Sequence, residues 1–309
     1  MKAGVIDMGT NTFHLVIADF SEGEVDLIYK TNVPVKLGEG RLNENIIIPE
    51  AFERGLQALT QFSHTLKAHD VKVLKATATS AVRNASNGPD FVQAVKERTG
   101  IDIEVISGDE EAAYIFSGVQ ATGVITDTTL IMDIGGGSTE FILCDTTQLL
   151  WKKSYDLGAA RLLQAFFKSD PISEADQSAI IRHVDQQIDE LKEACHKYQP
   201  KVLVGSAGAF ETFALLLHKG IDLKTLAWAP LSVNGYQQLS AQLIASTHEQ
   251  RSQMEDLIPL RVDLIVVAAL LTDYVLNTFA IPELRLSTFD LKMGVLHTLL
   301  AEQQSLNGR

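Results

Sequence analysis

The spacing of hydrophobic residues changes from a strand period to a helix period along the chain, and this change occurs twice. Apolar stretches at 3–7, 13–19 and 25–36 are separated by short turns, which predicts three antiparallel strands. Within 49–69, apolar residues recur at spacings of three and four, which predicts a helix with one buried face. Further strands are predicted at 71–76 and 101–106, and helices at 89–98 and 110–119.

The same order of elements begins again near residue 129. Strands are predicted at 129–133, 140–144 and 149–155, then helices at 160–167 and 174–198 and a buried strand at 201–204. The rest of the chain predicts helices at 210–218, 236–247, 262–279 and 291–302 and a strand at 283–287. Two rounds of this order predict an α/β protein with two domains and mixed sheets. We expect the boundary within 121–127, giving domains 1–124 and 125–309.

Composition narrows the class of protein. The chain has 309 residues, of which 46% are hydrophobic, and this favours a folded protein with room for two cores. Its formal charge of −13 argues against nucleic-acid binding. The apolar run 264–271 is too short to span a bilayer, and the chain opens on a strand instead of a signal peptide. Two isolated cysteines, Cys144 and Cys195, fit reduced thiols, so we expect a cytoplasmic protein.

A turn that begins with an aspartate and is rich in small residues occurs in both halves. Asp7-Met-Gly-Thr-Asn opens the first copy, and Asp133-Ile-Gly-Gly-Gly-Ser opens the second, each between two apolar strands. Such a turn can present backbone N–H groups to a phosphate beside a carboxylate. The alternative is an ordinary hairpin. Three consecutive glycines are costly on folding, so the second copy favours a ligand that approaches the backbone closely.

The acids of these turns are candidate ligands for a hard cation. Asp7 and Asp133 end apolar strands and could bind a divalent metal, although an aspartate that bonds to its own loop is the alternative. Glu140 follows the second turn and would add another oxygen ligand. His14 occupies the corresponding position of the first copy, so the second turn is the better metal candidate.

Three further places in the sequence are candidates for chemistry. Ser107 and Glu110 have the spacing of a capping box, which explains Glu110 without catalysis and leaves Glu111 a weak candidate base. Segment 77–83 gathers three hydroxyls and Arg83 at the end of a strand, where α/β sheets often bind ligands, although Arg83 could instead be an exposed residue of a helix start. Lys36 is a candidate phosphate ligand that could equally be solvated.

The loop Gly205-Ser206-Ala207-Gly208 is also a strand followed by a glycine-rich turn and a helix. Gly205, Ser206 and Gly208 are weak candidates for phosphate or sugar contacts. Many turns of this kind use glycine only for packing.

Together these stretches resemble the exopolyphosphatase / guanosine pentaphosphate phosphohydrolase (Ppx/GppA) family of the actin-like ATPase and sugar kinase fold group. The resemblance runs over nearly the whole chain and in the family's order. It is carried by Asp7-Met-Gly-Thr-Asn-Thr-Phe, Val35-Lys-Leu-Gly-Glu-Gly, Ala76-Thr-Ala-Thr-Ser-Ala-Val-Arg83, Ile106-Ser-Gly-Asp-Glu-Glu-Ala112, Asp133-Ile-Gly-Gly-Gly-Ser-Thr-Glu140 and Gly158-Ala-Ala-Arg161.

The resemblance implies a fold and a set of site residues. The implied fold is two actin-like (ribonuclease-H-like) domains with the active site in the interdomain cleft, and a last helix, about 291–302, that packs back on the first domain. It assigns the catalytic carboxylate to Glu111 and a magnesium ion, or another divalent cation, to Asp133 and Glu140. The phosphate contacts it implies are Thr10, Asn11, Arg83, Gly135, Gly136, Gly137 and Ser138.

Three departures from the family pattern accompany the resemblance. The chain stops at residue 309 and so is expected to lack the helical C-terminal extension of long members, which bears on processivity. Ala207 and Ala209 stand where glycine and threonine are usual, and Lys292-Met293 stands where an Arg-Glu pair is usual. The last two bear on guanosine-nucleotide handling more than on the hydrolytic core.

We therefore expect an exopolyphosphatase that uses magnesium and a glutamate base to remove the terminal phosphate of inorganic polyphosphate. Guanosine pentaphosphate is the alternative substrate, alone or as a second one. A weakly catalytic sensor of polyphosphate or nucleotide, and a kinase of the same fold group, are further alternatives. We expect neither nucleic acid nor membrane as a partner; a homodimer is left open.

Overall fold

The chain folds into two compact units, each built around one mixed β-sheet. The computed structural model describes residues 1–20, 25–206 and 208–307. The first unit is residues 1–121 together with 291–309, and the second is residues 122–290. The α/β class with two mixed sheets is therefore as predicted. The first part of this unit ends at Ala121, slightly before the predicted boundary at residue 124. The unit also includes the chain from Leu291 onward.

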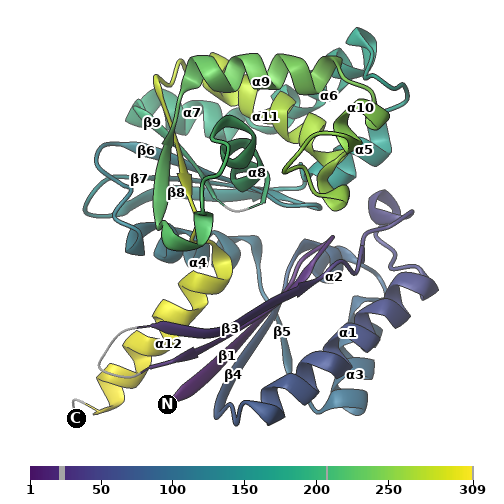
Figure 1. The fold of residues 1–309 in the computed structure, drawn as a ribbon, viewed down its shortest axis with the longest axis vertical. Coiled ribbons are helices and arrows are strands. Elements are labelled where there is room, and N and C mark those ends of the chain that lie inside the picture. Colours follow the sequence, from purple (N-terminus) through teal and green to yellow (C-terminus); the bar gives the residue numbers. More distant parts are fainter. Residues whose placement is uncertain (21–24, 207, 308–309) are drawn as a thin grey trace. The chain divides into compact units, whose positions relative to one another are not determined.

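The sheet of the first unit has the strand order β3-β2-β1-β4-β5 (Figure 1). β1 pairs antiparallel with β2 and β2 with β3, whereas β1 pairs parallel with β4 and β4 with β5. The meander and the parallel part thus share β1, whose C-terminal end carries the first aspartate turn. The strands are β1 (Lys2–Met8), β2 (Phe13–Asp19), β3 (Asp26–Val33), β4 (Val73–Ala78) and β5 (Ile103–Val105).

Helices cover this sheet because their apolar faces pack against it. Leu59 and Phe62 of α1 and Phe91 of α3 are buried in one cluster with Ile6 and Leu15 of the sheet, and Figure 1 shows α1 and α3 side by side. The C-terminal helix α12 packs against α4 and β1. The helices are α1 (Pro49–Ala68), α2 (Ser80–Asn84), α3 (Gly88–Thr99), α4 (Gly108–Ala121) and α12 (Leu291–Asn307), with a 3₁₀ turn, η1, at Leu42–Glu44.

The sheet of the second unit repeats this plan with one more strand, in the order β10-β11-β9-β6-β7-β8. β6, β7 and β8 form the antiparallel meander, β6 pairs parallel with β9 and β9 with β11, and β10 is antiparallel to β11. Here β6 is the shared strand, and the triple-glycine turn follows it. The strands are β6 (Thr129–Ile134), β7 (Thr139–Cys144), β8 (Leu149–Tyr155), β9 (Val202–Ser206), β10 (Trp228–Leu231) and β11 (Glu283–Ser287).

One face of this second sheet packs on a large apolar core. Leu130, Phe141 and Leu203 of the sheet are buried in one cluster with Phe213 of α8 and Leu271 of α11. The helices are α5 (Ala159–Phe166), α6 (Glu174–Gln187), α7 (Asp189–Tyr198), α8 (Gly208–Leu217), α9 (Val233–Ala245), α10 (His248–Ser252) and α11 (Leu264–Thr278), with 3₁₀ turns η2 (Leu223–Thr225) and η3 (Pro259–Arg261).

Most predicted elements are present within a few residues, and the differences have local causes. The single helix predicted at 174–198 is wrong: α6 and α7 are separated at Ile188, whose backbone leaves the helical conformation while its side chain stays in the core. The spacing of apolar residues continues through this break, so the sequence pattern does not reveal it. The strand predicted at 25–36 ends at Val33, because Pro34 has no N–H to donate to the sheet.

Among the described residues, two short α-helices and one short strand were not predicted. α2 and α10 have only five residues each, too few to establish a helical period, and β10 is an edge strand of four residues that includes Pro230. Among the described residues, no helix combines the length and apolar character that crossing a membrane requires.

Candidate functional site

The first aspartate turn is held in place by the segment that follows β3. The N–H of Gly9 donates to the Thr12 carbonyl at 3.2 Å, which closes the turn between β1 and β2. The carbonyls of Thr10 and Asn11 accept hydrogen bonds from the N–H groups of Gly38 (3.0 Å) and Lys36 (2.8 Å). Since C=O and N–H of one trans peptide unit point in opposite directions, the N–H groups of Asn11 and Thr12 face away from this segment.

Lys36 therefore contributes to the first turn through its backbone. It has a positive φ of 50°, and its carbonyl accepts a hydrogen bond from Arg54 Nη2 at 3.2 Å, so its main chain is fixed on both sides. Its side chain is exposed. A phosphate contact through its ammonium group stays a prediction.

The second aspartate turn is held in the same way by the start of α5. The carbonyl of Gly135 accepts from the N–H of Ala159 at 2.9 Å, and the carbonyl of Gly136 accepts from Ala160 at 2.9 Å and Arg161 at 3.1 Å. Arg161 also donates through Nε to the carbonyl of Gly137 at 3.1 Å. By the same peptide geometry, the N–H groups of three successive residues, Gly136, Gly137 and Ser138, point away from α5. Successive outward N–H groups of this kind form an anion-binding concavity.

Close packing explains why the residue opposite this turn is a glycine. A Cβ atom on Gly158 would lie 2.4 Å from backbone atoms of Gly136 and Gly137. The backbone of Gly158 has an ordinary extended conformation, with φ −70° and ψ 152°, so the requirement for glycine comes from contact alone. Gly158 thus lets the start of α5 approach the turn closely enough to hold its carbonyls.

Arg161 is a residue of this site that the sequence reasoning did not assign a role. Only 11% of its side chain is exposed, and its Nη2 lies 4.0 Å from a carboxylate oxygen of Asp156. It stands at the base of the glycine turn and brings a positive charge there. The stretch Gly158-Ala-Ala-Arg161 is one of those that carry the family resemblance, and it is the sequence signal that could have pointed to Arg161.

The candidate base Glu111 forms an ion pair with the candidate phosphate ligand Arg83. Arg83 Nη1 lies 2.8 Å from Glu111 Oε2 and also donates to the Ile106 carbonyl at 3.0 Å. The side chains of Arg83 and Glu111 are only 18% and 9% exposed. The alternative interpretation of Arg83 as an exposed residue is therefore wrong. The structure brings together two residues that are 28 positions apart in the sequence.

The capping box predicted at the start of α4 is confirmed. The N–H of Glu110 donates to Ser107 Oγ at 3.2 Å, and the N–H of Ser107 donates to Glu110 Oε2 at 2.8 Å. Glu110 is thus occupied with the helix start. Glu111 lies about 100° further around the helix, which turns its side chain toward Arg83 instead.

A row of polar residues crosses the second sheet beside the glycine turn. In the strand register, Asp133 of β6 stands opposite Glu140 of β7 and beside Ser206 of β9, and Glu140 stands opposite Ser154 of β8. Residues in register on neighbouring strands project from the same face, so these four side chains share one face of the sheet. Ser154 Oγ donates to Glu140 Oε1 at 2.6 Å, and Glu140 is 1% exposed.

The first sheet has a corresponding row with a different composition. Asp7 stands opposite His14 and beside Thr77, and His14 stands opposite Asn32. An acid–acid pair in the second unit thus corresponds to an acid–imidazole pair in the first.

The acid pair of the second sheet fits the requirements of a magnesium ion. No cluster of three or more histidine, cysteine, aspartate or glutamate side chains able to hold a metal occurs in the described part of the chain. Magnesium in phosphoryl-transfer sites commonly takes one or two carboxylates and completes its shell with substrate oxygens and water. Asp133 and Glu140 would supply two such carboxylates. In the first sheet Asp7 would supply one, because the residue opposite it is His14.

The third glycine-containing turn, after β9, has a packing role. A Cβ atom on Gly205 would lie 1.9 Å from the ring of Phe210, so Gly205 makes room for the core. Ser206 Oγ donates to the Phe289 carbonyl at 3.4 Å. Ala207 lies outside the described residues. The carbonyl of Gly208, whose φ is 23°, accepts a hydrogen bond from Arg261 Nη1.

Arg261 is a second basic residue that the sequence reasoning missed. It donates to Thr212 Oγ1 at 2.6 Å, and its Nη2 lies 3.6 Å from Glu211 Oε2. Burial lowers the pKa of its guanidinium, although the nearby Glu211 carboxylate opposes this change. Its guanidinium joins η3 to the first turn of α8.

Solved structures of other proteins share the fold of this chain. A crystal structure of an exopolyphosphatase from Cytophaga hutchinsonii is 37% identical and has a TM-score of 0.95, over 98% of each chain. A Ppx/GppA enzyme from Aquifex aeolicus, at 24% identity and a TM-score of 0.81 over 96% of this chain and 99% of its own, has the same fold.

Two sequence relatives differ in how much of their length is matched. A relative from Haemophilus influenzae is 28% identical over 96% of this chain and 91% of its own length. The guanosine-5'-triphosphate,3'-diphosphate pyrophosphatase of Vibrio vulnificus is 30% identical over 82% of this chain but only 50% of its own length. The chain thus spans about half of the Vibrio relative.

A family model extends across most of both units. The model of the Ppx/GppA phosphatase family matches residues 16–303, which include Arg83, Glu111, the triple-glycine turn and the acid pair. The chain belongs to the Ppx/GppA phosphatase family.

Proposed function

We propose that this protein is an exopolyphosphatase that hydrolyses the terminal phosphoanhydride bond of inorganic polyphosphate. The observation that carries the proposal is the turn at 135–138, whose carbonyls accept hydrogen bonds from the start of α5, so that its N–H groups point away from α5. A polyphosphate is rich in the anionic oxygens that such N–H groups bind. The exopolyphosphatase of Cytophaga hutchinsonii, 37% identical over 98% of the chain, supports this substrate class.

In the proposed reaction, backbone N–H groups and one arginine bind the terminal phosphate. The N–H groups of Gly136, Gly137 and Ser138 and the guanidinium of Arg83 bind its oxygens. A guanidinium has five N–H donors, so Arg83 can contact phosphate while Nη1 remains with Glu111. A magnesium ion held by Asp133 and Glu140 would offset the negative charge that the phosphoryl group carries during transfer.

Glu111 acts as the general base in this proposal. Its carboxylate accepts a proton from a water molecule whose oxygen attacks the terminal phosphorus. The bond between that phosphorus and the bridging oxygen breaks, and the bridging oxygen leaves with the shortened chain. The products are orthophosphate and a polyphosphate with one phosphate fewer. The ion pair with Arg83 fixes the orientation of Glu111 before substrate arrives.

Guanosine pentaphosphate is the second candidate substrate. It is favoured by the relationship to the Vibrio vulnificus pyrophosphatase, of which this chain matches 50%. The bond to be hydrolysed is again a terminal phosphoanhydride, so the same residues would serve. We further propose that the enzyme works in the cytoplasm without nucleic-acid or membrane partners.

The test compares phosphate release from polyphosphates of graded length and from guanosine pentaphosphate, with and without magnesium. Glu111→Gln should reduce release by about 100-fold or more, because it removes the base and keeps the shape. Glu110→Gln is the matched control, since glutamine can serve in a capping box. A folded Glu111→Gln protein with near wild-type release would show that the base is misassigned. Tight polyphosphate binding without release by the wild type would favour a sensor.

A further inference from the structure

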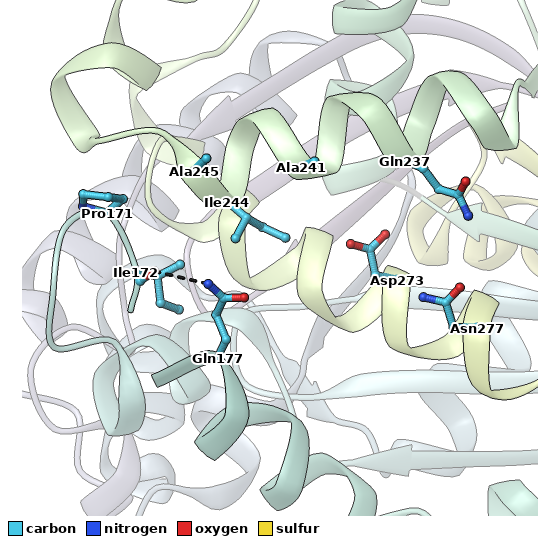
Figure 2. A pocket seen from close by; sticks show the side chains of 9 residues that line it. All are labelled: Pro171, Ile172, Gln177, Gln237, Ala241, Ile244, Ala245, Asp273 and Asn277. Carbon is cyan, nitrogen blue, oxygen red and sulfur yellow. Dashed lines mark hydrogen bonds between the residues drawn. The ribbon is translucent and has the colours of Figure 1, made fainter. Parts of the chain in front are cut away.

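A groove in the second unit lies between α9, α11 and the segment that leads into α6 (Figure 2). Its volume is about 480 Å³, which is within the range of small-molecule sites. It is separate from the residues of the phosphate site described above. Its lining residues are Pro171, Ile172, Gln177, Gln237, Ala241, Ile244, Ala245, Asp273 and Asn277.

The sequence of the two helices creates this space. Gln237, Ala241 and Ala245 recur every four residues on α9 and therefore lie along one face, where the two alanines leave room. Asp273 and Asn277 are likewise four residues apart on α11. Figure 2 shows the carboxylate of Asp273 between these helices, on the side of the groove facing α9.

Asp273 gives the groove its charge. Its Oδ2 accepts a hydrogen bond from Ser240 Oγ at 2.5 Å, which orients the carboxylate. Among the residues that the structure describes, the lining contains one acid and neither lysine, arginine nor histidine. A carboxylate withdrawn from water without a cation beside it is costly, and burial accordingly raises the pKa of Asp273.

The other lining groups define the ligand that would fit. An alkylammonium group has three N–H donors. The Asp273 carboxylate and the amide oxygens of Gln237 and Asn277 are acceptors for them. The apolar side chains of Ile172 and Ile244 suit a hydrocarbon chain. A phosphate would meet a carboxylate and no cation here, so the groove does not suit the substrate or product of the proposed hydrolysis.

We infer that this groove binds a small aliphatic amine in its protonated form, with Asp273 as the counter-ion. This inference does not depend on the proposed function. The groove would be a second binding site, which selects a cation, whereas the site proposed at the turn 135–138 selects an anion.

The test is calorimetric titration of the full chain with putrescine at neutral pH. Putrescine should bind, whereas n-butanol and inorganic phosphate should not bind in this groove. Asp273→Asn should weaken binding by about tenfold or more, because it removes the charge and keeps the shape. Glu193→Gln, which changes an exposed acid outside the lining, is the charge-matched control and should bind as wild type does.

A second variant and a pH series make the test independent of one substitution. Ala241→Leu fills the groove from an exposed helix position and should also abolish binding. Binding should weaken as the pH falls through the raised pKa of Asp273, because the carboxyl group loses its charge. Absent putrescine binding, equal binding of n-butanol, or unchanged binding by folded Asp273→Asn or Ala241→Leu would overturn the inference.

Discussion

Replacing Gly158 by alanine should displace the triple-glycine turn of the second unit. The added Cβ would lie 2.4 Å from backbone atoms of Gly136 and Gly137, whereas ordinary contact begins at 3.4 Å. The turn and α5 must therefore separate by about 1 Å, and side-chain rotation cannot relieve a contact with backbone. That movement stretches three hydrogen bonds from the start of α5 to the carbonyls of Gly135 and Gly136.

The expected losses follow from these contacts. At about 1 kcal/mol for each hydrogen bond, the free energy of unfolding should fall by about 2–3 kcal/mol. A displacement of about 1 Å at the phosphate should lower phosphate release by about 100-fold. Urea unfolding of the purified variant measures the first quantity, and steady-state phosphate release from polyphosphate measures the second.

Gly235→Ala is the matched control for this variant. Gly235 is in the same unit, on α9, and the nearest atom to an added Cβ is Ser232 Cβ at 3.4 Å. This change should leave release unaltered and stability equal or slightly higher, because alanine favours a helix over glycine. If Gly158→Ala unfolds at the wild-type urea concentration and binds inorganic phosphate as wild type does, the account of the turn is refuted.

Four further changes test other parts of the structure. Arg83→Lys keeps the charge but loses the planar guanidinium, so kcat/KM for polyphosphate should fall about 100-fold; a near wild-type kcat/KM would exclude the proposed contact between the guanidinium and the phosphate. Ser154→Ala removes the 2.6 Å bond to Glu140 and should weaken magnesium binding, measured by calorimetry, about tenfold, whereas Ser154→Thr should keep it. Gly294→Ala would place a Cβ 1.7 Å from a backbone carbonyl of α4, so urea unfolding should show a loss of about 2 kcal/mol or more; an unchanged midpoint would contradict the packing of α12. Burial lowers the pKa of His297, so its contribution to stability is present above pH 6.5 and is lost as the pH falls through the lower folded value; His297→Gln should flatten that part of a stability–pH curve.

The sequence predicted the class of fold because the signals for it are local. Strand and helix periods, proline near the start of α3 and the capping box at Ser107 each depend on residues close together in the chain. The break at Ile188 escaped prediction because its side chain remains in the core, so the apolar spacing is unchanged there.

The candidate site was predicted as separate motifs, and their connections were not. The ion pair of Arg83 and Glu111 joins residues from different elements, so no spacing in the sequence could reveal it. The same applies to Ser154, whose bond to Glu140 depends on the register of β7 and β8. The groove at Asp273 was missed because its lining residues come from α9, α11 and the segment around the start of α6, which are far apart in the sequence.

The two units share a device for holding a turn but differ in the chemistry beside it. In each, N–H groups from the segment after the third strand bind the carbonyls of the turn, so its own N–H groups face the opposite way. This device uses only backbone atoms and tolerates different side chains. In the second unit the residue opposite the aspartate is Glu140, which completes a pair of carboxylates. In the first unit the residue at that position is His14, so there is no such pair. We propose that the backbone of both turns can bind anions and that a divalent cation would be held in the second unit.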